Sequence, residues 1–400
     1  MSHSLYVHIP FCRHRCAYCD FNTYAGQGER MPEYVSALQA EIRVLAASAP
    51  GRLPAGTVFF GGGTPSLLGI EDFRQVLQTV DDHFDLADPA SLETSLEANP
   101  GTLTLAYLRD LRLLGFNRLS LGVQSFHPEE LRLLERIHDP LDVYAAVRWA
   151  RRAGFENLNL DLIFGLPEQP LGRWQATVKQ ALDLDPEHLS LYALTVEDGT
   201  PFGRWAARGR LPLPDPDLAA EMYEWAGEYL EGRGYHQYEI SNWARPGREC
   251  RHNLQYWRNQ PYLGFGAGAH GYANGMRVAN VLRIKTYIER CRNRKAGPFP
   301  ISPATVASRV ISRAEEMSET MLTGLRLVAE GVSAEGFRRR FGRALMAVFG
   351  KEIDELLGLN LLEWAPAAVD GEGSGAGDRI LRLTSAARII ANQVFIRFVS

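Results

Sequence analysis

Near its N-terminus the chain reads Tyr6-Val-His-Ile-Pro-Phe-Cys-Arg-His-Arg-Cys-Ala-Tyr-Cys-Asp20, a stretch in which Cys12, Cys16 and Cys19 fall within eight residues. An iron–sulfur cubane asks for four thiolate ligands. Three cysteines on one short loop can therefore hold three irons and leave the fourth iron without a protein ligand. From this spacing we predict a [4Fe-4S] cluster with one open iron, to which a small molecule can bind.

Two other interpretations of the three cysteines are a zinc site and a disulfide. A zinc site would need a fourth cysteine or histidine at suitable spacing, and His14 could supply it. A disulfide cannot satisfy an odd group of three thiols. We favour the open cluster because motifs farther along the chain supply what such a cluster needs.

Outward from the cysteines, the first half of the chain alternates short apolar or β-branched runs with amphipathic stretches. Repeated strand-then-helix order predicts an α/β fold with parallel strands and right-handed crossovers, and six such units suggest an incomplete barrel. The predicted strands are Leu5 to Ile9, Thr57 to Phe60, Leu92 to Glu97, Arg118 to Val123, Leu158 to Ile163 and His188 to Leu194. The predicted helices are Glu33 to Ala47, Ile70 to Phe84, Leu103 to Leu114, Leu141 to Ala153 and Gly172 to Leu184.

Each predicted strand is followed by a motif that could carry chemistry. In barrels of this type the active residues lie at the C-terminal ends of the strands. In strand order these motifs are the cysteines, Gly61 to Pro65, Glu97, Gln124, Asp161 and Tyr192-Ala193. A chance scatter of motifs would not show this order.

The cysteine loop resembles that of the radical S-adenosylmethionine (SAM) enzymes, whose open iron binds the amino and carboxylate groups of SAM. Tyr18, directly before the third cysteine, fits the same pattern. Further motifs resemble the oxygen-independent coproporphyrinogen III oxidase family over nearly the whole chain, including its heme-chaperone branch. They are Tyr6-Val-His-Ile-Pro-Phe-Cys12, Gly61-Gly-Gly-Thr-Pro65, Glu97-Ala-Asn-Pro100, Gly122-Val-Gln-Ser125, Asp161-Leu-Ile-Phe-Gly-Leu-Pro167 and His252-Asn-Leu-Gln-Tyr-Trp257.

The resemblance implies a six-unit radical SAM barrel and a set of SAM-binding positions. Gly62, Gly63 and Thr64 match residues that contact the methionine end of SAM. Glu97 and Arg136 match residues that hold SAM, and the arginine suits its carboxylate. The remaining cofactor-site candidates are Gln124 and Asp161 on the adenosyl or substrate side, Ala193 at the sixth strand end, and Tyr6 and Tyr18 near the cluster.

A structural role is the alternative for each of these residues. Glu97, Gln124, Arg136 and Asp161 could be buried polar residues satisfied by neighbouring loop backbone. A glycine triplet alone could be a flexible turn, and Tyr6 could be an ordinary core tyrosine. Their common position beyond strands that follow the cysteine loop favours the binding roles.

One departure from the family pattern separates two branches. In the branch of the family that oxidises coproporphyrinogen III, the dehydrogenases, a further cysteine follows two residues after the third cluster ligand. This chain has Asp20-Phe21-Asn22 there. The resemblance is therefore to the heme-chaperone branch. The motif of residues 252–257 agrees, because His252 could ligate heme iron and Tyr256 with Trp257 could cover a porphyrin face.

Structural roles are again the alternatives in this second motif. A hydrogen-bonded histidine and packed aromatic rings would explain it without heme. Cys250 is another candidate iron ligand, although a buried inert thiol is the simpler interpretation.

Composition predicts an ordinary cytoplasmic protein of 400 residues, with 46% hydrophobic residues and a formal net charge of -4. This balance argues against a nucleic-acid binder, which would show a basic surface. No apolar run approaches the roughly 20 residues of a membrane span, and no apolar signal region is present.

Changes along the chain predict three parts. Residues 1–200 form the barrel, residues 201–295 form an extension with the second motif, and residues 304–400 form a winged-helix-like α+β domain after a linker rich in helix breakers. We expect the last part to cover the barrel mouth or to dock a protein.

Two functions fit these observations. The first is a heme chaperone that binds a [4Fe-4S] cluster, SAM and heme and passes heme to acceptors such as respiratory proteins. An electron donor such as flavodoxin or ferredoxin, a homodimer and peripheral membrane contact are possible further partnerships. The alternative is a radical enzyme that takes hydrogen from two propionate side chains of coproporphyrinogen III before carbon dioxide leaves.

Overall fold

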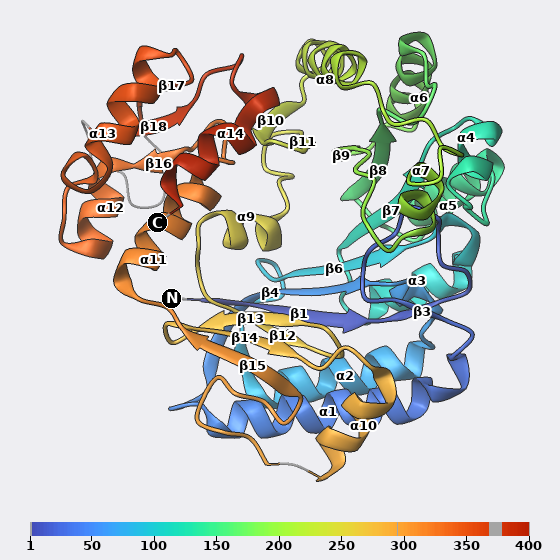
Figure 1. Ribbon diagram of the computed structural model, residues 1–400. Coiled ribbons are helices and arrows are strands. Elements are labelled where there is room, and N and C mark those ends of the chain that lie inside the picture. Colours follow the sequence, from blue (N-terminus) through green and yellow to red (C-terminus); the bar gives the residue numbers. More distant parts are fainter. Residues whose placement is uncertain (1, 294, 368–377, 400) are drawn as a thin grey trace. The chain divides into compact units, whose positions relative to one another are not determined.

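The computed structural model describes residues 2–293, 295–367 and 378–399 (Figure 1). The chain divides into two compact units. The first comprises Met1–Ala226 and Pro261–Arg309, and the second comprises Gly227–Gln260 and Val310–Ser400. The chain thus leaves the first unit, contributes one segment to the second, returns, and ends in the second. The division into three parts stays a prediction from the sequence.

The first unit is built on a sheet whose six central strands all pair in parallel (Figure 1). Their order along the sheet is β9, β8, β7, β6, β4, β1. This arrangement confirms the predicted α/β fold. The strands are β1 (His3–Ile9), β4 (Leu53–Gly62), β6 (Glu93–Ala98), β7 (Arg118–Gln124), β8 (Leu158–Phe164) and β9 (His188–Ala193).

Beyond β1, the sheet is continued by the segment that returns after residue 260. β12 (Tyr262–Phe265) pairs in parallel with β1, and β13 (His270–Ala273) and β14 (Met276–Asn280) follow in antiparallel order, with β15 (Thr305–Val310) beside β14. The short strands β2 (Phe11–Cys12) and β3 (Tyr24–Ala25) pair with each other, and β5 (Phe84–Leu86) pairs with β4. The sequence prediction contained none of these strands, which lie outside the strand-then-helix repeats on which it was based.

Helices follow the parallel strands, as predicted. In α1 the buried residues Val35, Leu38, Ile42 and Leu45 recur every three or four positions and form one apolar face. The helices and turns that lie within this unit are η1 (Gly28–Arg30), α1 (Met31–Ser48), η2 (Pro65–Leu67), α2 (Ile70–His83), η3 (Pro100–Thr102), α3 (Leu105–Leu113), α4 (Pro128–Leu133), α5 (Pro140–Arg152), α6 (Leu171–Asp183), α7 (Pro201–Ala206) and α10 (Ile284–Asn293). The boundary between the units falls within α8 (Pro216–Glu231).

The parallel strands carry polar residues on one face. In β8 the buried leucines at 158, 160 and 162 alternate with Asn159 and Asp161, which therefore point to the opposite face. Asn159 Nδ2 donates to Ser120 Oγ at 2.7 Å and to Asp161 Oδ1 at 2.8 Å. The bond from Asn159, together with one from Ser120, holds the Asp161 carboxylate in place on this polar face.

The second unit combines a helical core with a three-stranded antiparallel sheet in the order β16, β18, β17. Its core includes Met321, Phe337, Ile353 and Leu381. This α+β arrangement is the one predicted for the C-terminal part. Its elements are β10 (His236–Glu239), β11 (Asn242–Ala244), α9 (Arg251–Trp257), α11 (Arg313–Gly324), β16 (Val332–Ser333), α12 (Ala334–Phe341), α13 (Leu345–Gly358), β17 (Leu362–Pro366), β18 (Arg379–Leu383), η4 (Arg388–Ile390), α14 (Ala391–Phe395) and η5 (Ile396–Phe398).

None of the helices in the described part of the chain combines the length and the apolar character that a membrane crossing requires.

Candidate cluster and cofactor site

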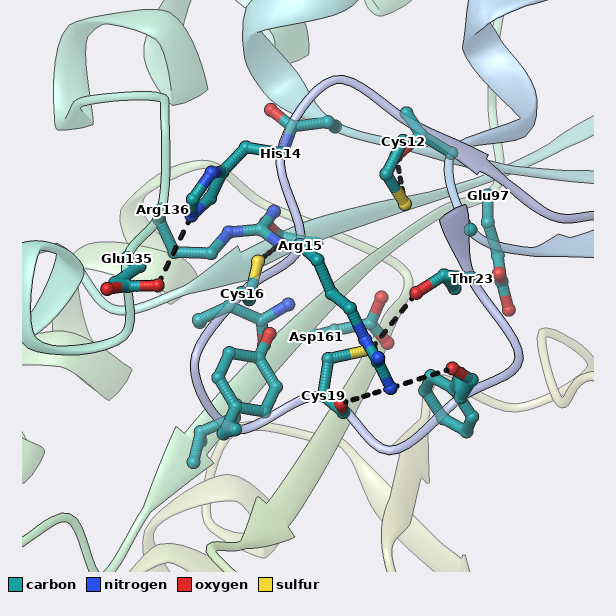
Figure 2. Close-up of a pocket in the computed structure, with 18 of the residues that line it drawn as sticks. Cys12, His14, Arg15, Cys16, Cys19, Thr23, Glu97, Glu135, Arg136 and Asp161 are labelled. Atoms are coloured by element: carbon teal, nitrogen blue, oxygen red, sulfur yellow. Dashed lines mark hydrogen bonds and ion pairs between the residues drawn. The ribbon is translucent and has the colours of Figure 1, made fainter. Parts of the chain in front are cut away.

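A cavity of about 420 Å³ lies where the parallel strands of the first unit end, and the cysteine loop forms one of its walls (Figure 2). Most of the residues that the sequence singled out line this cavity. They are Cys12, Cys16, Tyr18, Cys19, Gly62, Gly63, Thr64, Glu97, Gln124, Arg136, Asp161 and Ala193. Tyr6 is not among the lining residues, and His252, Tyr256 and Trp257 belong to the second unit.

The three cysteines are free thiols that are neither fully buried nor fully exposed. The Thr64 hydroxyl donates to Cys12 Sγ at 3.6 Å, and Arg136 Nη1 donates to Cys16 Sγ at 3.4 Å. Burial raises the pKa of Cys12 and of Cys19, so these thiols keep their protons until a metal displaces them. Both donors are suited to stabilise the thiolate form of their cysteine.

The residues fit an open cubane. Within the described parts of the chain, no three His, Cys, Asp or Glu side chains are arranged to hold a single metal ion. A cubane makes no such demand, because its protein thiolates bind three different irons. His14, which could have completed a zinc site, lies 3.3 Å from Glu135 Oε2 through its Nε2 atom.

The glycine motif brings backbone close to the loop. Gly62 has a φ of 116°, a conformation that strongly favours glycine, and a Cβ at this position would collide with the His8 ring. The Gly62 N–H donates to Glu97 Oε2 at 2.9 Å. The motif is therefore an ordered part of the cavity wall, with a geometry that other residues could not adopt.

The Glu97 carboxyl has a pKa well above the usual value for glutamate. Burial raises its pKa to about 7, and the neighbouring Asp161 carboxylate adds to the rise. The Gly62 N–H and the Arg118 charge lower the pKa in part. Glu97 and Asp161 face the same cavity as the three cysteines (Figure 2), so the site carries acidic groups suited to a cationic ligand.

Gln124 is the last residue of β7, and Asp161 lies in the middle of the adjacent strand β8. Asp161 Oδ2 accepts a bond of 3.0 Å from Ser120 Oγ, and burial raises the pKa of the carboxyl. The pairing of β7 with β8 shifts register just before Gln124, which has a φ of 67°. Left-handed backbone is uncommon for glutamine and often marks functional sites.

Arg136 reaches the cluster loop from the segment after α4. Its Nη2 donates to the Gly122 carbonyl at 2.6 Å, while Nη1 contacts Cys16 (Figure 2). Its buried Nε has no hydrogen-bond acceptor among the described residues. This donor, at the cavity wall, is the kind of orphaned polar atom that a carboxylate ligand would satisfy.

Several contributors were missed by sequence reasoning. Tyr6 does not line the cavity; its hydroxyl donates to His8 Nδ1 at 3.0 Å, so His8 is a partner that the sequence did not reveal. Ser120 and Asn159, which the sequence analysis did not single out, hold Asp161. Alternation along the strands could have identified Ser120 and Asn159, because both share the polar face with Asp161.

The motif in α9 has a different character. His252 is 1% exposed, and its Nε2 shares a hydrogen bond of 2.8 Å with the Tyr256 hydroxyl. The Arg326 guanidinium lies 4.3 Å from the centre of the Trp257 ring and also pairs with Glu239 at 3.3 Å. His252, Tyr256 and the face of the Trp257 ring therefore already have protein partners, whereas the buried Trp257 Nε1 has no hydrogen-bond acceptor among the described residues.

Comparison with protein families gives two matches. The model of the radical SAM superfamily matches residues 6–181, and the model of the HemN C-terminal domain matches residues 311–365. Among solved structures, the coproporphyrinogen III oxidase HemN from Escherichia coli is similar with a TM-score of 0.81 over 99% of this chain and 90% of that one, at 24% identity. At this identity the match supports the fold.

Curated relatives extend over most of the chain. The heme chaperone HemW of Bacillus subtilis is 39% identical over 392 residues, which cover 98% of both chains. The HemW of Synechocystis is 40% identical over 82% of this chain and 79% of its own, and the HemW of Escherichia coli is 44% identical over 67% and 69%. From the full-length match, together with the radical SAM domain and the three-cysteine loop, we conclude that the chain belongs to the heme chaperone HemW family of radical SAM proteins.

Proposed function

We propose that this protein is a heme chaperone that carries a [4Fe-4S] cluster, binds SAM at the open iron, and holds heme for transfer to acceptor proteins such as respiratory enzymes. The observation that carries the proposal is the cavity in which three free cysteines meet the glycine motif and two carboxylates. The full-length similarity to proteins named heme chaperone HemW favours heme as the cargo.

The residues of the cavity divide the work of binding. Cys12, Cys16 and Cys19 hold three irons, and the cluster supplies the open coordination position for SAM. Gly62, Gly63, Thr64 and Glu97 receive the methionine end, with the Glu97 carboxylate placed to accept a hydrogen bond from the amino group. Arg136 donates from Nε to the SAM carboxylate, while Gln124, Asp161 and Ala193 line the adenosyl side and Tyr18 packs beside the cluster.

His252 is our candidate for the heme ligand. Its Nε2 atom is occupied by the Tyr256 hydroxyl, so this bond must break before that atom can bind iron. The rings of Tyr256 and Trp257 offer apolar surface to a porphyrin once they turn toward it. Heme binding at this motif therefore requires a local rearrangement.

The partners follow from this function. Heme acceptors receive the cargo, and a low-potential donor such as flavodoxin or ferredoxin reduces the cluster. We propose a cytoplasmic protein that touches the membrane only at its periphery, where respiratory acceptors lie, and that is able to form a homodimer. Nucleic acid is not an expected partner for a chain with a net charge of -4.

The alternative function is the oxidation of coproporphyrinogen III by radical chemistry. It shares the cavity and the cluster loop with the chaperone. Phe21 occupies the position where the dehydrogenases have an additional cysteine, and its side chain is 65% exposed at the cavity wall. This difference in the loop favours the chaperone.

One paired experiment tests the proposal. The reconstituted protein is titrated anaerobically with heme, and in parallel supplied with coproporphyrinogen III, reductant and SAM. We expect a saturable Soret band and no protoporphyrinogen IX. His252→Ala should weaken or shift the Soret band without changing cluster content, whereas the exposed His236→Ala, in the same unit, should leave both unchanged. Absence of specific heme binding, or turnover of coproporphyrinogen III at an enzyme-like rate, would contradict the chaperone.

A further inference from the structure

The cluster loop is tied to a distant part of the first unit through Asn22, three residues after Cys19. Asn22 Nδ2 donates to the Ala267 carbonyl at 2.9 Å and to the Leu282 carbonyl at 3.0 Å. The backbone carbonyl of Asn22 accepts a bond of 3.0 Å from His8 Nε2. One residue thus joins the loop to β1 and to the segment that contains β13 and β14.

The backbone that receives Asn22 is itself fixed by a buried carboxylate. Glu41 of α1 is 0% exposed, and its Oε2 accepts from the Gly266 N–H at 2.8 Å. Three further donors surround the same carboxylate: Asn280 Nδ2 at 2.7 Å, the Tyr287 hydroxyl at 2.6 Å and the Ser302 hydroxyl at 2.7 Å. These donors offset part of the cost of burying the carboxylate, although burial still raises the pKa of Glu41, and together they hold it in one position.

Tyr34 connects this anchor to β1, the strand that precedes the cysteine loop. The Tyr34 hydroxyl accepts from the Ala267 N–H at 2.9 Å and donates to the His8 carbonyl at 2.8 Å. Ala267 is therefore held through its N–H by Tyr34 and through its carbonyl by Asn22. Glu41 holds the preceding residue.

The fit around Asn22 is close. Gly268 has a φ of 81°, and a Cβ at this position would lie 2.5 Å from Asn22 Nδ2. Any larger residue at 268 would push the Asn22 amide away from its two acceptors. The backbone at 266–268 is thus shaped around this one side chain.

We propose that Asn22 is a positioning residue for the open cluster. Glu41 supports Asn22 indirectly, because it holds Gly266, the residue before Ala267. This inference rests on the cluster site proposed above. With three protein thiolates instead of four, retention of the cluster depends more strongly on how well the loop is ordered. The Asn22 clamp, formed with the carbonyls of Ala267 and Leu282, fixes the end of the loop that follows Cys19.

The test compares Asn22→Asp with Tyr24→Phe. The aspartate has nearly the same shape but replaces the donor with a charged oxygen that faces two carbonyl oxygens. Tyr24→Phe removes a bond of 3.1 Å to the same Leu282 carbonyl but leaves both Asn22 bonds in place. After anaerobic reconstitution, we measure the rate of cluster loss to a chelator and the EPR spectrum of the reduced cluster.

We expect Asn22→Asp to lose the cluster about tenfold faster than the wild type, because both hydrogen bonds donated by Asn22 are lost, and to show a broadened or shifted EPR signal. Tyr24→Phe should stay within about twofold. Glu41→Gln, which turns one acceptor into a donor among donors, should also accelerate loss.

Thermal unfolding of the metal-free proteins separates positioning from general stability. Metal-free Asn22→Asp should unfold a few degrees below the wild type, as the loss of its hydrogen bonds requires, but should stay fully folded at the temperature of the assay. A wild-type rate and spectrum in Asn22→Asp would overturn the clamp, as would a large drop in its unfolding temperature that accounts for the loss. Failure of the wild type to assemble a cluster would instead refute the proposed function.

Discussion

The cysteine loop and the α9 motif were both singled out by sequence, yet their side chains are in opposite states. Around the cysteines, an open cavity is lined by thiols, two carboxylates and an arginine with an unused buried donor. In α9, His252 is buried and bonded to Tyr256, and Trp257 packs under Arg326. The first site is organised for ligands in advance, whereas the second must rearrange.

This difference predicts different energetics for the two kinds of ligand. A preorganised cavity spends little binding free energy on reordering its side chains. In α9, the His252–Tyr256 bond and the contact of Arg326 with the Trp257 ring must first be lost, so part of the intrinsic affinity for heme is spent on opening. A carrier that must also release its cargo is compatible with such a cost.

The largest expected effect is the loss of the cluster on substitution of one of its cysteines. Cys16→Ala should abolish the four-iron cluster, because a cubane left with two protein thiolates is poorly held. Iron and sulfide analysis with the visible spectrum after anaerobic reconstitution measures this. Cys250→Ala, a change at a fully buried thiol in the second unit, should retain the full cluster. Full retention of iron and sulfide in Cys16→Ala would contradict the assignment of the three-cysteine loop as the cluster site.

A smaller effect concerns Glu97. Glu97→Gln should weaken SAM binding to the cluster-loaded protein about tenfold, since a charge-assisted hydrogen bond becomes a neutral one. Because the pKa of Glu97 is about 7, wild-type affinity for SAM should rise between pH 6 and pH 8 as the carboxyl ionises. Titration followed by EPR should show that Glu97→Gln lacks this rise.

The same carboxyl should oppose the stability of the ligand-free protein. Its pKa is higher in the folded than in the unfolded state, so its favourable contribution exists below the unfolded pKa and is lost as the pH rises through about 7. Above pH 7, ligand-free Glu97→Gln should therefore unfold at a higher temperature than the wild type. An unchanged or lower unfolding temperature would mean that Glu97 is not destabilised by burial.

Sequence reasoning anticipated much of the first site for a physical reason. Parallel strands bring their C-terminal ends together, so residues such as Glu97, Gln124 and Asp161 could be assigned to one place from the order of strands alone. The residues that hold the cluster loop in place, Asn22 and Glu41, could not be predicted in this way. Asn22 and Glu41 act through residues more than 200 positions away, and pairing over such distances leaves no periodic signal.

The second motif shows the other limit of sequence reasoning. The spacing of four residues between His252 and Tyr256 puts them on one helix face, where they can bond to each other as well as to a ligand. The motif alone does not distinguish these states. The Arg326 contact with Trp257 depends on the packing of the turn after α11, which follows much later in the chain.

A more modest change should sharpen the second site. Tyr256→Phe removes the hydroxyl that occupies His252 Nε2 but keeps the ring. If His252 ligates heme, this change should tighten heme binding about fivefold, the equivalent of one net hydrogen bond, whereas His252→Ala should weaken it. Soret titrations of the three proteins measure both. Weakening by Tyr256→Phe would indicate that the hydroxyl assists heme binding instead of competing with it.

The smallest expected effect is at His14, the residue that could have completed a zinc site. His14 and Glu135 form a solvent-accessible pair with side-chain exposures of 47% and 38%, and such pairs contribute about 0–1 kcal/mol at most. His14→Ala should therefore keep wild-type iron, sulfide and chelator resistance. If zinc were the native metal, the variant would instead lose one of four ligands and its zinc affinity would fall steeply. Metal analysis of the wild type and of His14→Ala, each purified without oxygen, decides between the two, because only a cubane on the three cysteines is indifferent to this imidazole.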